Sequence, residues 1–121
     1  FRQLVYNLLS NSLKYVKHDT APVIIINTET ITNAQIIDDN LLEGKEYVKI
    51  TITDNGIGFE EHFSKKIFEV FQRLHTKQEY VGTGIGLAIV KKIVQNHFGY
   101  IGATSELNKG SVFTVVVPKQ Q

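Results

Sequence analysis

The stretch Val48-Lys49-Ile50-Thr51-Ile52-Thr53-Asp54-Asn55-Gly56-Ile57-Gly58 joins a strand pattern to a turn. Its first six residues alternate between apolar and polar side chains, which predicts a strand with one buried face. Counting on by two from Ile50 and Ile52 places Asp54 on that same face. A carboxylate there needs a hydrogen-bond donor from the protein, from water or from a ligand. We therefore expect Asp54 either to cap its own turn or to bind a ligand.

Two glycine-rich segments allow close approach to the backbone. Gly56 and Gly58 follow the strand, and without a Cβ atom they let a flat ligand lie against main-chain atoms. The second segment, Gly82-Thr83-Gly84-Ile85-Gly86-Leu87, directly precedes a helical pattern. The free N–H groups and the dipole at a helix start favour phosphate. Taken alone, this segment is equally consistent with a tight turn that binds nothing.

The chain opens with an amphipathic helical pattern. Apolar side chains recur at helical spacing from Phe1 to about Lys17, and Ser12 occupies the same stripe. A second stripe runs beside it and consists of Asn7, Asn11, Lys14 and Tyr15. Amide groups at the edge of a buried face need partners or a ligand. A solvated polar edge is the simpler interpretation of this helix considered alone.

The other elements follow from periodicity and turn residues. Val23-Ile24-Ile25-Ile26 predicts a strand buried on both faces that continues to about residue 30, and 31–46 is expected to form a hairpin tip or loop. Helices are expected at 60–74 and 87–98, with Gly99 as the helix stop. The segment 75–81 between them has the composition of a mobile lid. Strands are expected at 100–106 and 111–117, joined by a hairpin at 108–110.

Composition limits the classes of function. A chain of 121 residues with 42% hydrophobic and 21% charged residues is typical of one soluble globular domain. Its formal charge of +1 gives no reason to expect nucleic-acid or direct membrane contact. The absence of cysteine excludes disulfides and a cysteine nucleophile. No apolar run is long enough to span a membrane. Because the chain begins inside a helical pattern without Met, we expect a fragment of a longer protein.

Together these features suit a magnesium nucleotide. Asp54 can accept a hydrogen bond from an exocyclic amine, which favours adenine over guanine. Side-chain amide oxygens suit magnesium, which is usually shared with phosphates. Lys14 and the helix start at Gly84 and Gly86 complement phosphate charge.

In these motifs the chain resembles the catalytic and ATP-binding domain of two-component sensor histidine kinases. The similar segments, in chain order, are 7–15 (N box), 54–59 (G1 box), 67–73 (F box), 82–87 (G2 box), 97–101 and 110–114. The chain departs from the usual pattern at Ser12, Val70 and Phe98, where Ala, Pro and Gly are usual. The resemblance implies an α+β two-layer sandwich of the Bergerat type. In that fold a mixed, mostly antiparallel sheet of about five strands packs against about three helices.

The resemblance also implies roles for individual residues. Asn11 is the expected magnesium ligand, Asn7 contacts phosphate or supports the metal, Lys14 reaches phosphate, and Arg73 helps to position the γ-phosphate. At the base, Tyr15 stacks near the adenine and ribose, and Asp54 binds the adenine amine directly and through water. Gly56 and Gly58 allow the close approach, and Thr114 holds a bridging water. The backbone around the phosphates is supplied by Gly82, Thr83, Gly84, Ile85, Gly86 and Leu87.

The implied function is histidine kinase activity with ATP and Mg²⁺ as cofactors. The expected partners are ATP or ADP and an upstream dimerisation and phosphotransfer domain, with a response regulator acting indirectly. Residues 1–121 would form one cytoplasmic domain of a homodimeric protein. The full-length protein could also be anchored in a membrane by another segment. His18, although followed by Asp19, is not expected to be the phosphoacceptor. His97 is expected to pack against or cap its helix.

Other functions remain open on the sequence alone. One is a non-catalytic nucleotide-binding regulatory module or an anti-sigma-type serine kinase of the same superfamily, although the F box favours the histidine-kinase branch. Another is a plain α/β interaction domain. For the kinase interpretation, we predict that the lid from about Lys77 to Gly82 is poorly ordered without nucleotide, because it lacks apolar anchors.

Overall fold

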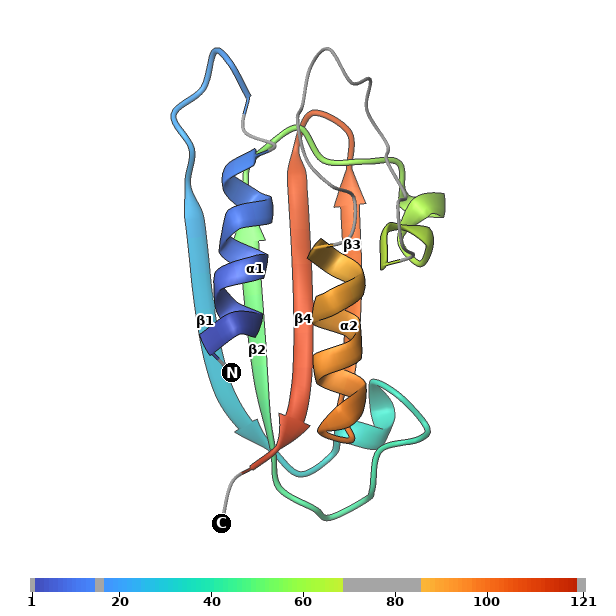
Figure 1. Cartoon of the computed structure of the whole chain (residues 1–121). Helices are drawn as coiled ribbons and strands as arrows, with labels where there is room; N and C mark the ends of the chain where they lie inside the picture. Colours follow the sequence, from blue (N-terminus) through green and yellow to red (C-terminus); the bar gives the residue numbers. More distant parts are fainter. Residues whose placement is uncertain (1, 15–16, 69–85, 120–121) are drawn as a thin grey trace.

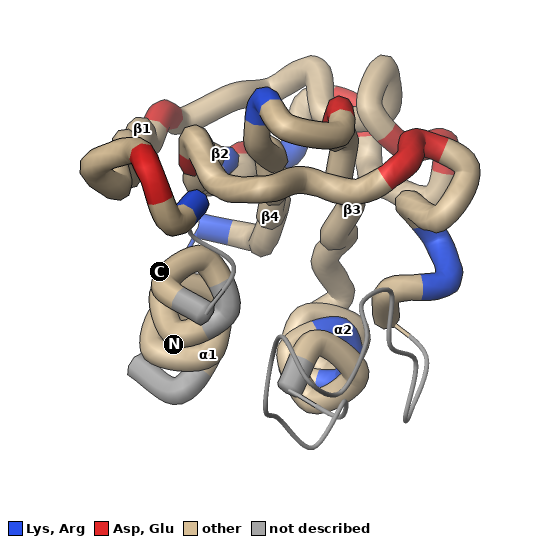
Figure 2. Tube along the Cα trace, turned by 90° about the horizontal axis from the view of Figure 1, so that it is seen from above, with Lys and Arg blue, Asp and Glu red and all other residues tan. Residues whose placement is uncertain are grey.

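One antiparallel sheet and two helices form the described part of the protein. The structure, a computed structural model, describes residues 2–14, 17–68 and 86–119. The strands β1 (Ile24–Ile31), β2 (Tyr47–Asp54), β3 (Tyr100–Glu106) and β4 (Gly110–Pro118) lie in the order β1-β2-β4-β3. The helices α1 (Arg2–Lys14) and α2 (Gly86–Asn96) lie side by side on one face of the sheet (Figures 1 and 2). The predicted two-layer α+β architecture is therefore confirmed.

The main core lies between the sheet and the helices. On β2 and β4, Ile52 pairs with Phe113, Ile50 with Val115, and Val48 with Val117. Leu4 and Leu8 of α1 and Val90 and Val94 of α2 pack into the same cluster, as the apolar stripes predict. Full burial of one such side chain contributes about 1.5–3 kcal/mol. The alternation of β2 and β4 therefore decides which side chains face the helices.

A smaller core lies on the other face of the sheet. It consists of Ala34, Leu41, Tyr47 and Val116. The first two come from the segment 31–46, which contains the 3₁₀ helix η1 (Ala34–Ile36). The hydroxyl of Tyr47 accepts a hydrogen bond from the backbone N–H of Leu42 at 3.0 Å. The segment expected to be a loop thus covers one end of the far face.

The expectation that 23–26 is buried on both faces is wrong. Among the described strands β1 lies at the edge and pairs with β2 alone, and Val23, Ile25 and Ile26 are about half exposed. An apolar run shows the character of the side chains but does not show whether a second strand or helix covers them.

The helix predicted at 60–74 also differs in its described part. Residues 60–68 form two short 3₁₀ helices, η2 (Glu61–Phe63) and η3 (Lys66–Phe68), and 69–74 lie outside the described residues. Ile67 and Phe68 are buried, and the ring of Phe68 meets Phe113 edge-on at 6.3 Å between centroids. Of the described positions at that spacing, Ile67 is buried and Phe63 packs partly buried against the core, whereas the type of helix differs from the prediction.

α2 ends at Asn96, two residues before the expected end at 98. Phe98, with φ of 59°, occupies the left-handed conformation expected for Gly99. The N–H of Gly99 then bonds to the carbonyl of Val94 at 3.0 Å, which closes the helix. Of the helices that the structure describes, neither is long and apolar enough to cross a membrane.

Candidate nucleotide-binding site

The carboxylate of Asp54 is held from two directions. Its Oδ1 accepts a hydrogen bond from the backbone N–H of Gly56 at 2.9 Å. Its Oδ2 accepts one from the hydroxyl of Ser12 at 3.2 Å. Ser12 belongs to α1 and is 2% exposed, so the bond crosses from the helix layer to the sheet. The alternation in β2 thus predicted the inward orientation of Asp54 correctly.

Asp54 has one of the two roles that the sequence left open and keeps the capacity for the other. It caps its own turn through Gly56, which uses one lone pair of Oδ1. An ionised carboxylate offers about four acceptor sites, and two remain after Gly56 and Ser12 have donated. The side chain is only partly buried. Asp54 can therefore hold its turn and still accept from an amine of a ligand.

At position 58, contacts within the protein already require a glycine. Its φ is +66°, and an added Cβ would meet the carbonyl oxygen of Glu106 and lie 2.9 Å from the Oγ of Ser105. The backbone N–H of Asn108 also bonds to the carbonyl of Ile57 at 2.7 Å. The turn after β2 is thus packed against the β3–β4 hairpin, so the missing Cβ makes room for protein backbone.

The placement of Thr114 contradicts its expected role. Thr114 pairs with Thr51 on β2, whereas Asp54 pairs with Ser111. Since Phe113 and Val115 face the helices, Thr114 points to the far face of the sheet and away from Asp54. Ser111 is the β4 residue on the same row and the same face as Asp54. The motif-based reasoning missed Ser111, although counting back by two from Phe113 identifies it.

An unpartnered amide lies on the same face of the sheet. Asn7 of α1 is partly buried, and its Nδ2 has no hydrogen-bond partner in the described part of the chain. A buried donor left in this way costs about 1–3 kcal/mol unless a ligand supplies an acceptor. A phosphate oxygen is such an acceptor, so the unpaired amide of Asn7 is compatible with the phosphate contact that the family resemblance implies.

Several predicted site residues cannot be placed. Tyr15, Arg73, Gly82, Thr83, Gly84 and Ile85 lie outside the described residues, as do Val70 and the predicted lid. The backbones of Asn11 and Lys14 belong to α1, but their side chains are not described. Gly86 and Leu87 form the first turn of α2, where the phosphate end was expected, and Leu87 packs against the main core.

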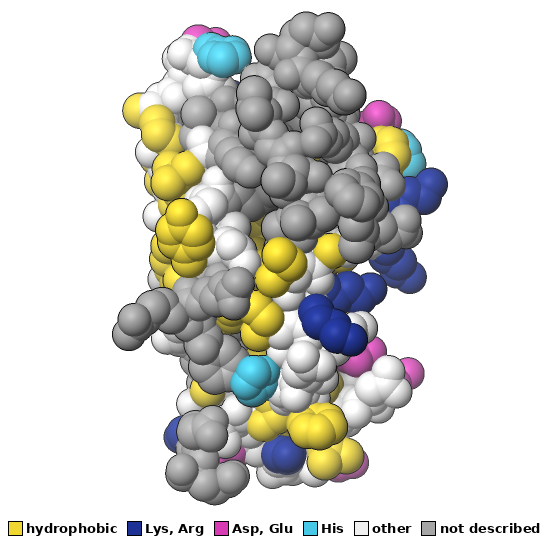
Figure 3. Space-filling view, viewed as in Figure 1, with side chains coloured by type: hydrophobic (Ala, Val, Ile, Leu, Met, Phe, Trp, Pro, Cys, Tyr) yellow, Lys and Arg dark blue, Asp and Glu magenta, His cyan; other side chains and the backbone are white. Residues whose placement is uncertain are grey.

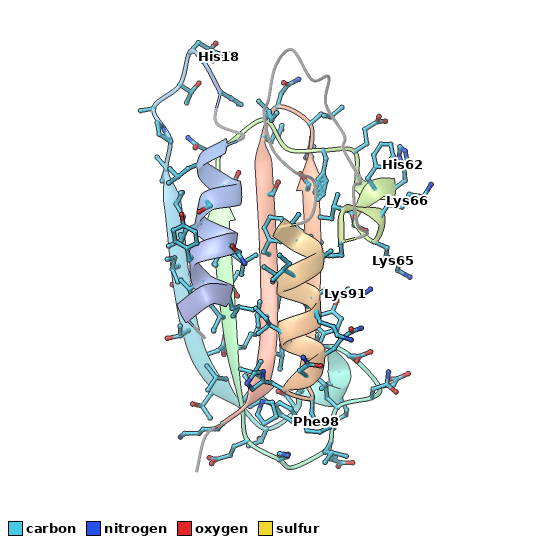
Figure 4. The ribbon with its side chains drawn as sticks, in the orientation of Figure 1. His18, His62, Lys65, Lys66, Lys91 and Phe98 are labelled. Atoms are coloured by element: carbon cyan, nitrogen blue, oxygen red, sulfur yellow. The ribbon has the colours of Figure 1, made fainter. Side chains whose placement is uncertain are left out.

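Three lysine side chains lie on the side of α2 that faces away from α1 (Figures 3 and 4). Lys65, Lys66 and Lys91 are exposed there, beside η3 and α2 (Figures 3 and 4). A cavity of about 560 Å³ opens between η3, α2 and β3, and it includes none of the predicted nucleotide contacts. The volume of this cavity therefore does not mark the nucleotide site, and the candidate site is the set of polar groups around Asp54.

Three of the four histidines lie in the described part of the chain. His18 lies in an exposed turn at one end of the molecule, and His62 lies on η2 against Phe63 (Figure 4). The Nδ1 of His97 lies 2.8 Å from the carbonyl oxygen of Ile93, which fits the expected helix cap. His75 lies outside the described residues. Among the residues with described placement, no group of three or more His, Cys, Asp or Glu could hold a metal.

The chain is similar in sequence to known proteins. The chain is 40% identical over 116 residues to cyanobacterial phytochrome A of Nostoc sp. (strain PCC 7120 / SAG 25.82 / UTEX 2576), covering 96% of this chain and 13% of that protein. It thus spans a small part of this relative.

Two solved structures are also similar. The catalytic domain of histidine kinase ThkA has a TM-score of 0.69 at 27% identity, over 98% of this chain and 65% of that one. Full-length ShkA in complex with AMPPNP has a TM-score of 0.71 at 26% identity, over 97% and 21%. Residues 1–121 match the family described as "Histidine kinase-, DNA gyrase B-, and HSP90-like ATPase". The chain therefore belongs to this family of ATPases.

Proposed function

We propose that the chain binds ATP with Mg²⁺ and presents its γ-phosphate to a histidine on a separate helical domain. The observation that carries the proposal is the carboxylate of Asp54, which two protein donors fix on the helix-covered face and which keeps acceptor capacity. An amine such as that of adenine is the complementary group. Membership of the ATPase family and the likeness to ShkA, whose structure contains AMPPNP, support the choice of ATP.

The phosphate end of the proposed site lies between α1 and the start of α2. Asn7 would donate its buried amide, which has no partner among the described residues, to a phosphate oxygen. We propose Asn11 as the magnesium ligand and Lys14 as a further phosphate contact, with Arg73 near the γ-phosphate. The segment 82–87 would supply backbone N–H groups, and Tyr15 would stack near the base. Magnesium, when bound, offsets negative charge on the phosphates.

The base end is tested by Asp54→Asn. The change replaces one carboxylate oxygen by an amide that can only donate there, so ATP loses a charged hydrogen bond. Bonds to charged groups contribute about 1.5–3 kcal/mol, which corresponds to a rise in Kd of about 10- to 100-fold. Titration calorimetry with Mg-ATP measures the change.

The matched control is Asp39→Asn, which removes an exposed carboxylate in the segment between β1 and β2. It should leave the Kd for ATP within about twofold, as expected for a surface change. No binding of ATP or ADP by the unmodified chain at millimolar concentration, or equal losses in the two variants, would contradict the proposed site.

The kinase step is a separate part of the proposal. The family resemblance implies that the phosphoryl acceptor lies on an upstream domain, since none is assigned within residues 1–121. Incubation of the full-length protein with labelled ATP should give an acid-labile, base-stable phosphoprotein, as a phosphohistidine would. ATP binding without any such product would favour a non-catalytic regulatory module, and an acid-stable product would favour a serine kinase.

A further inference from the structure

Ser105 of β3 lies beside the base end of the proposed site. The residues Asp54, Ser111 and Ser105 form one row across β2, β4 and β3. They share the face that the helices cover. The Oγ of Ser105 lies within hydrogen-bond distance of three groups. These are the backbone N–H of Phe59 at 2.8 Å, the carbonyl oxygen of Gly110 at 2.7 Å and the Oγ of Ser111 at 3.0 Å.

Counting protons fixes the direction of each bond. A serine hydroxyl donates one hydrogen bond and accepts at most two. The N–H of Phe59 can only donate, and the carbonyl of Gly110 can only accept. The single proton of Ser105 therefore goes to Gly110. The remaining contact requires Ser111 to donate its own proton to Ser105.

We infer that Ser105 is a positioning residue that makes Ser111 an acceptor only and thereby strengthens selection for an amino group on the base. This inference rests on the proposed function. With its proton directed to Ser105, the hydroxyl of Ser111 presents only lone pairs toward the row that contains Asp54. The Asp54 carboxylate also only accepts, and the proton of Ser12 is already directed to it. A 6-amino purine satisfies these acceptors, whereas a 6-oxo purine places an acceptor against them.

The surroundings hold Ser105 in this arrangement. Its backbone N–H bonds to Oε1 of Glu61 at 2.9 Å. Phe59 is 5% exposed and Gly110 is buried, so water does not readily replace Ser105 as their partner. The backbone N–H of Asn108 bonds to the carbonyl oxygen of Ile57 at 2.7 Å, which holds the neighbouring turn in place. Rotation of the Ser105 hydroxyl would break at least one buried bond, and the assignment of protons is therefore stable.

The test compares ATP with ITP, which differ in the 6-amino and 6-oxo groups. Titration calorimetry on the full chain gives the ratio of Kd for ITP to Kd for ATP. Ser105→Ala frees the proton of Ser111 to turn toward the base, so the ratio should fall about 3- to 10-fold, as expected for one hydrogen bond. A loss of stability alone would weaken both ligands together and leave the ratio unchanged.

A double-mutant cycle identifies the route of the effect. In the Ser111→Ala background, Ser105→Ala should change the ratio no further, because the hydroxyl through which it acts is gone. Ser111→Ala alone should also lower the ratio, and it leaves the bonds of Ser105 to Phe59 and Gly110 in place. The control Thr104→Ala, at an exposed site on the far face, should keep the unmodified ratio.

The outcomes separate the two proposals. If the unmodified chain does not bind ATP at millimolar concentration, the proposed function itself fails. If ATP binds but Ser105→Ala or Ser111→Ala leaves the ratio unchanged, the inference about Ser105 is overturned. The inference would also be overturned if Ser105→Ala changed the ratio of Kd values equally in the unmodified chain and in the Ser111→Ala variant. Should Ser105→Ala not fold, an unchanged ratio in Ser111→Ala would still overturn the inference, because Ser111 is the group through which Ser105 is inferred to act and its removal leaves no buried backbone group unpaired.

Discussion

Phe98 occupies a backbone conformation that suits glycine. It is 81% exposed at the end of α2 with φ of 59°, so its ring has few contacts to offset the steric cost (Figure 4). That cost is about 1–2 kcal/mol for a residue with a Cβ atom. Phe98→Gly should therefore raise the free energy of unfolding by about 1 kcal/mol, after the greater chain entropy of glycine is included. Urea denaturation measures the gain.

Phe98→Ala is the matched control for this prediction. It removes the ring but keeps the Cβ atom, so the steric cost remains and no gain in stability is expected. An equal gain from Ala and Gly would show that the exposed ring, rather than the backbone conformation, is the unfavourable feature.

At single residues, the alternation of side chains was a better guide than the motif. It placed Asp54 correctly, because a strand with one covered face leaves only one orientation for every second residue. The same count from Phe113 identifies Ser111, whereas the motif pointed to Thr114 on the far face. The bond from Ser12 to Asp54 could not be predicted, because it depends on how α1 packs across β2.

Among the elements, the contact between the turn after β2 and the β3–β4 hairpin leads to a prediction. Gly58→Ala should destabilise the protein by more than about 2 kcal/mol, because the new Cβ meets backbone of Glu106 in addition to the cost of positive φ. Gly44→Ala provides the control. Gly44 has φ of +79° but nothing within 4 Å of an added Cβ, so only about 1–2 kcal/mol should be lost. Similar losses at both sites in urea denaturation would contradict the packing argument.

Periodicity predicted the elements that have one covered face. β2, the β3–β4 hairpin and α2 lie close to their expected ranges. Periodicity was less informative where the burial of a segment depends on which other elements pack against it. The apolar run at 23–26 forms an edge strand, and the segment 31–46 packs under the far face through Ala34 and Leu41. The helical spacing at 60–68 is also compatible with two 3₁₀ turns, which bury the same side chains.

Considered as a whole, the proposed site joins segments that are distant in sequence. Asp54 lies on β2, Asn7 on α1 and Leu87 on α2, so a bound nucleotide would link the two helices to the sheet. A ligand that binds only the folded state at 100 times its Kd adds about 2.7 kcal/mol of stability. Mg-ATP at such a concentration should therefore raise the melting temperature by several degrees.

Differential scanning calorimetry measures this shift. Asp54→Asn should lose most of it at the same ATP concentration, while Asp39→Asn should keep it. A shift of the same size in both variants would mean that ATP stabilises the protein from a different place.

The sheet also limits where the length of the chain can change during evolution. One extra residue between Ser111 and Phe113 would move Ser111 to the far face, or else turn Phe113 out of the core. At the opposite end of the sheet, 42–46 is exposed and lies outside the small far-face core. Insertions and deletions among related sequences should therefore collect at 42–46 and be rare between 110 and 117. The row of Asp54, Ser111 and Ser105 would then keep its spacing while sequences diverge around it.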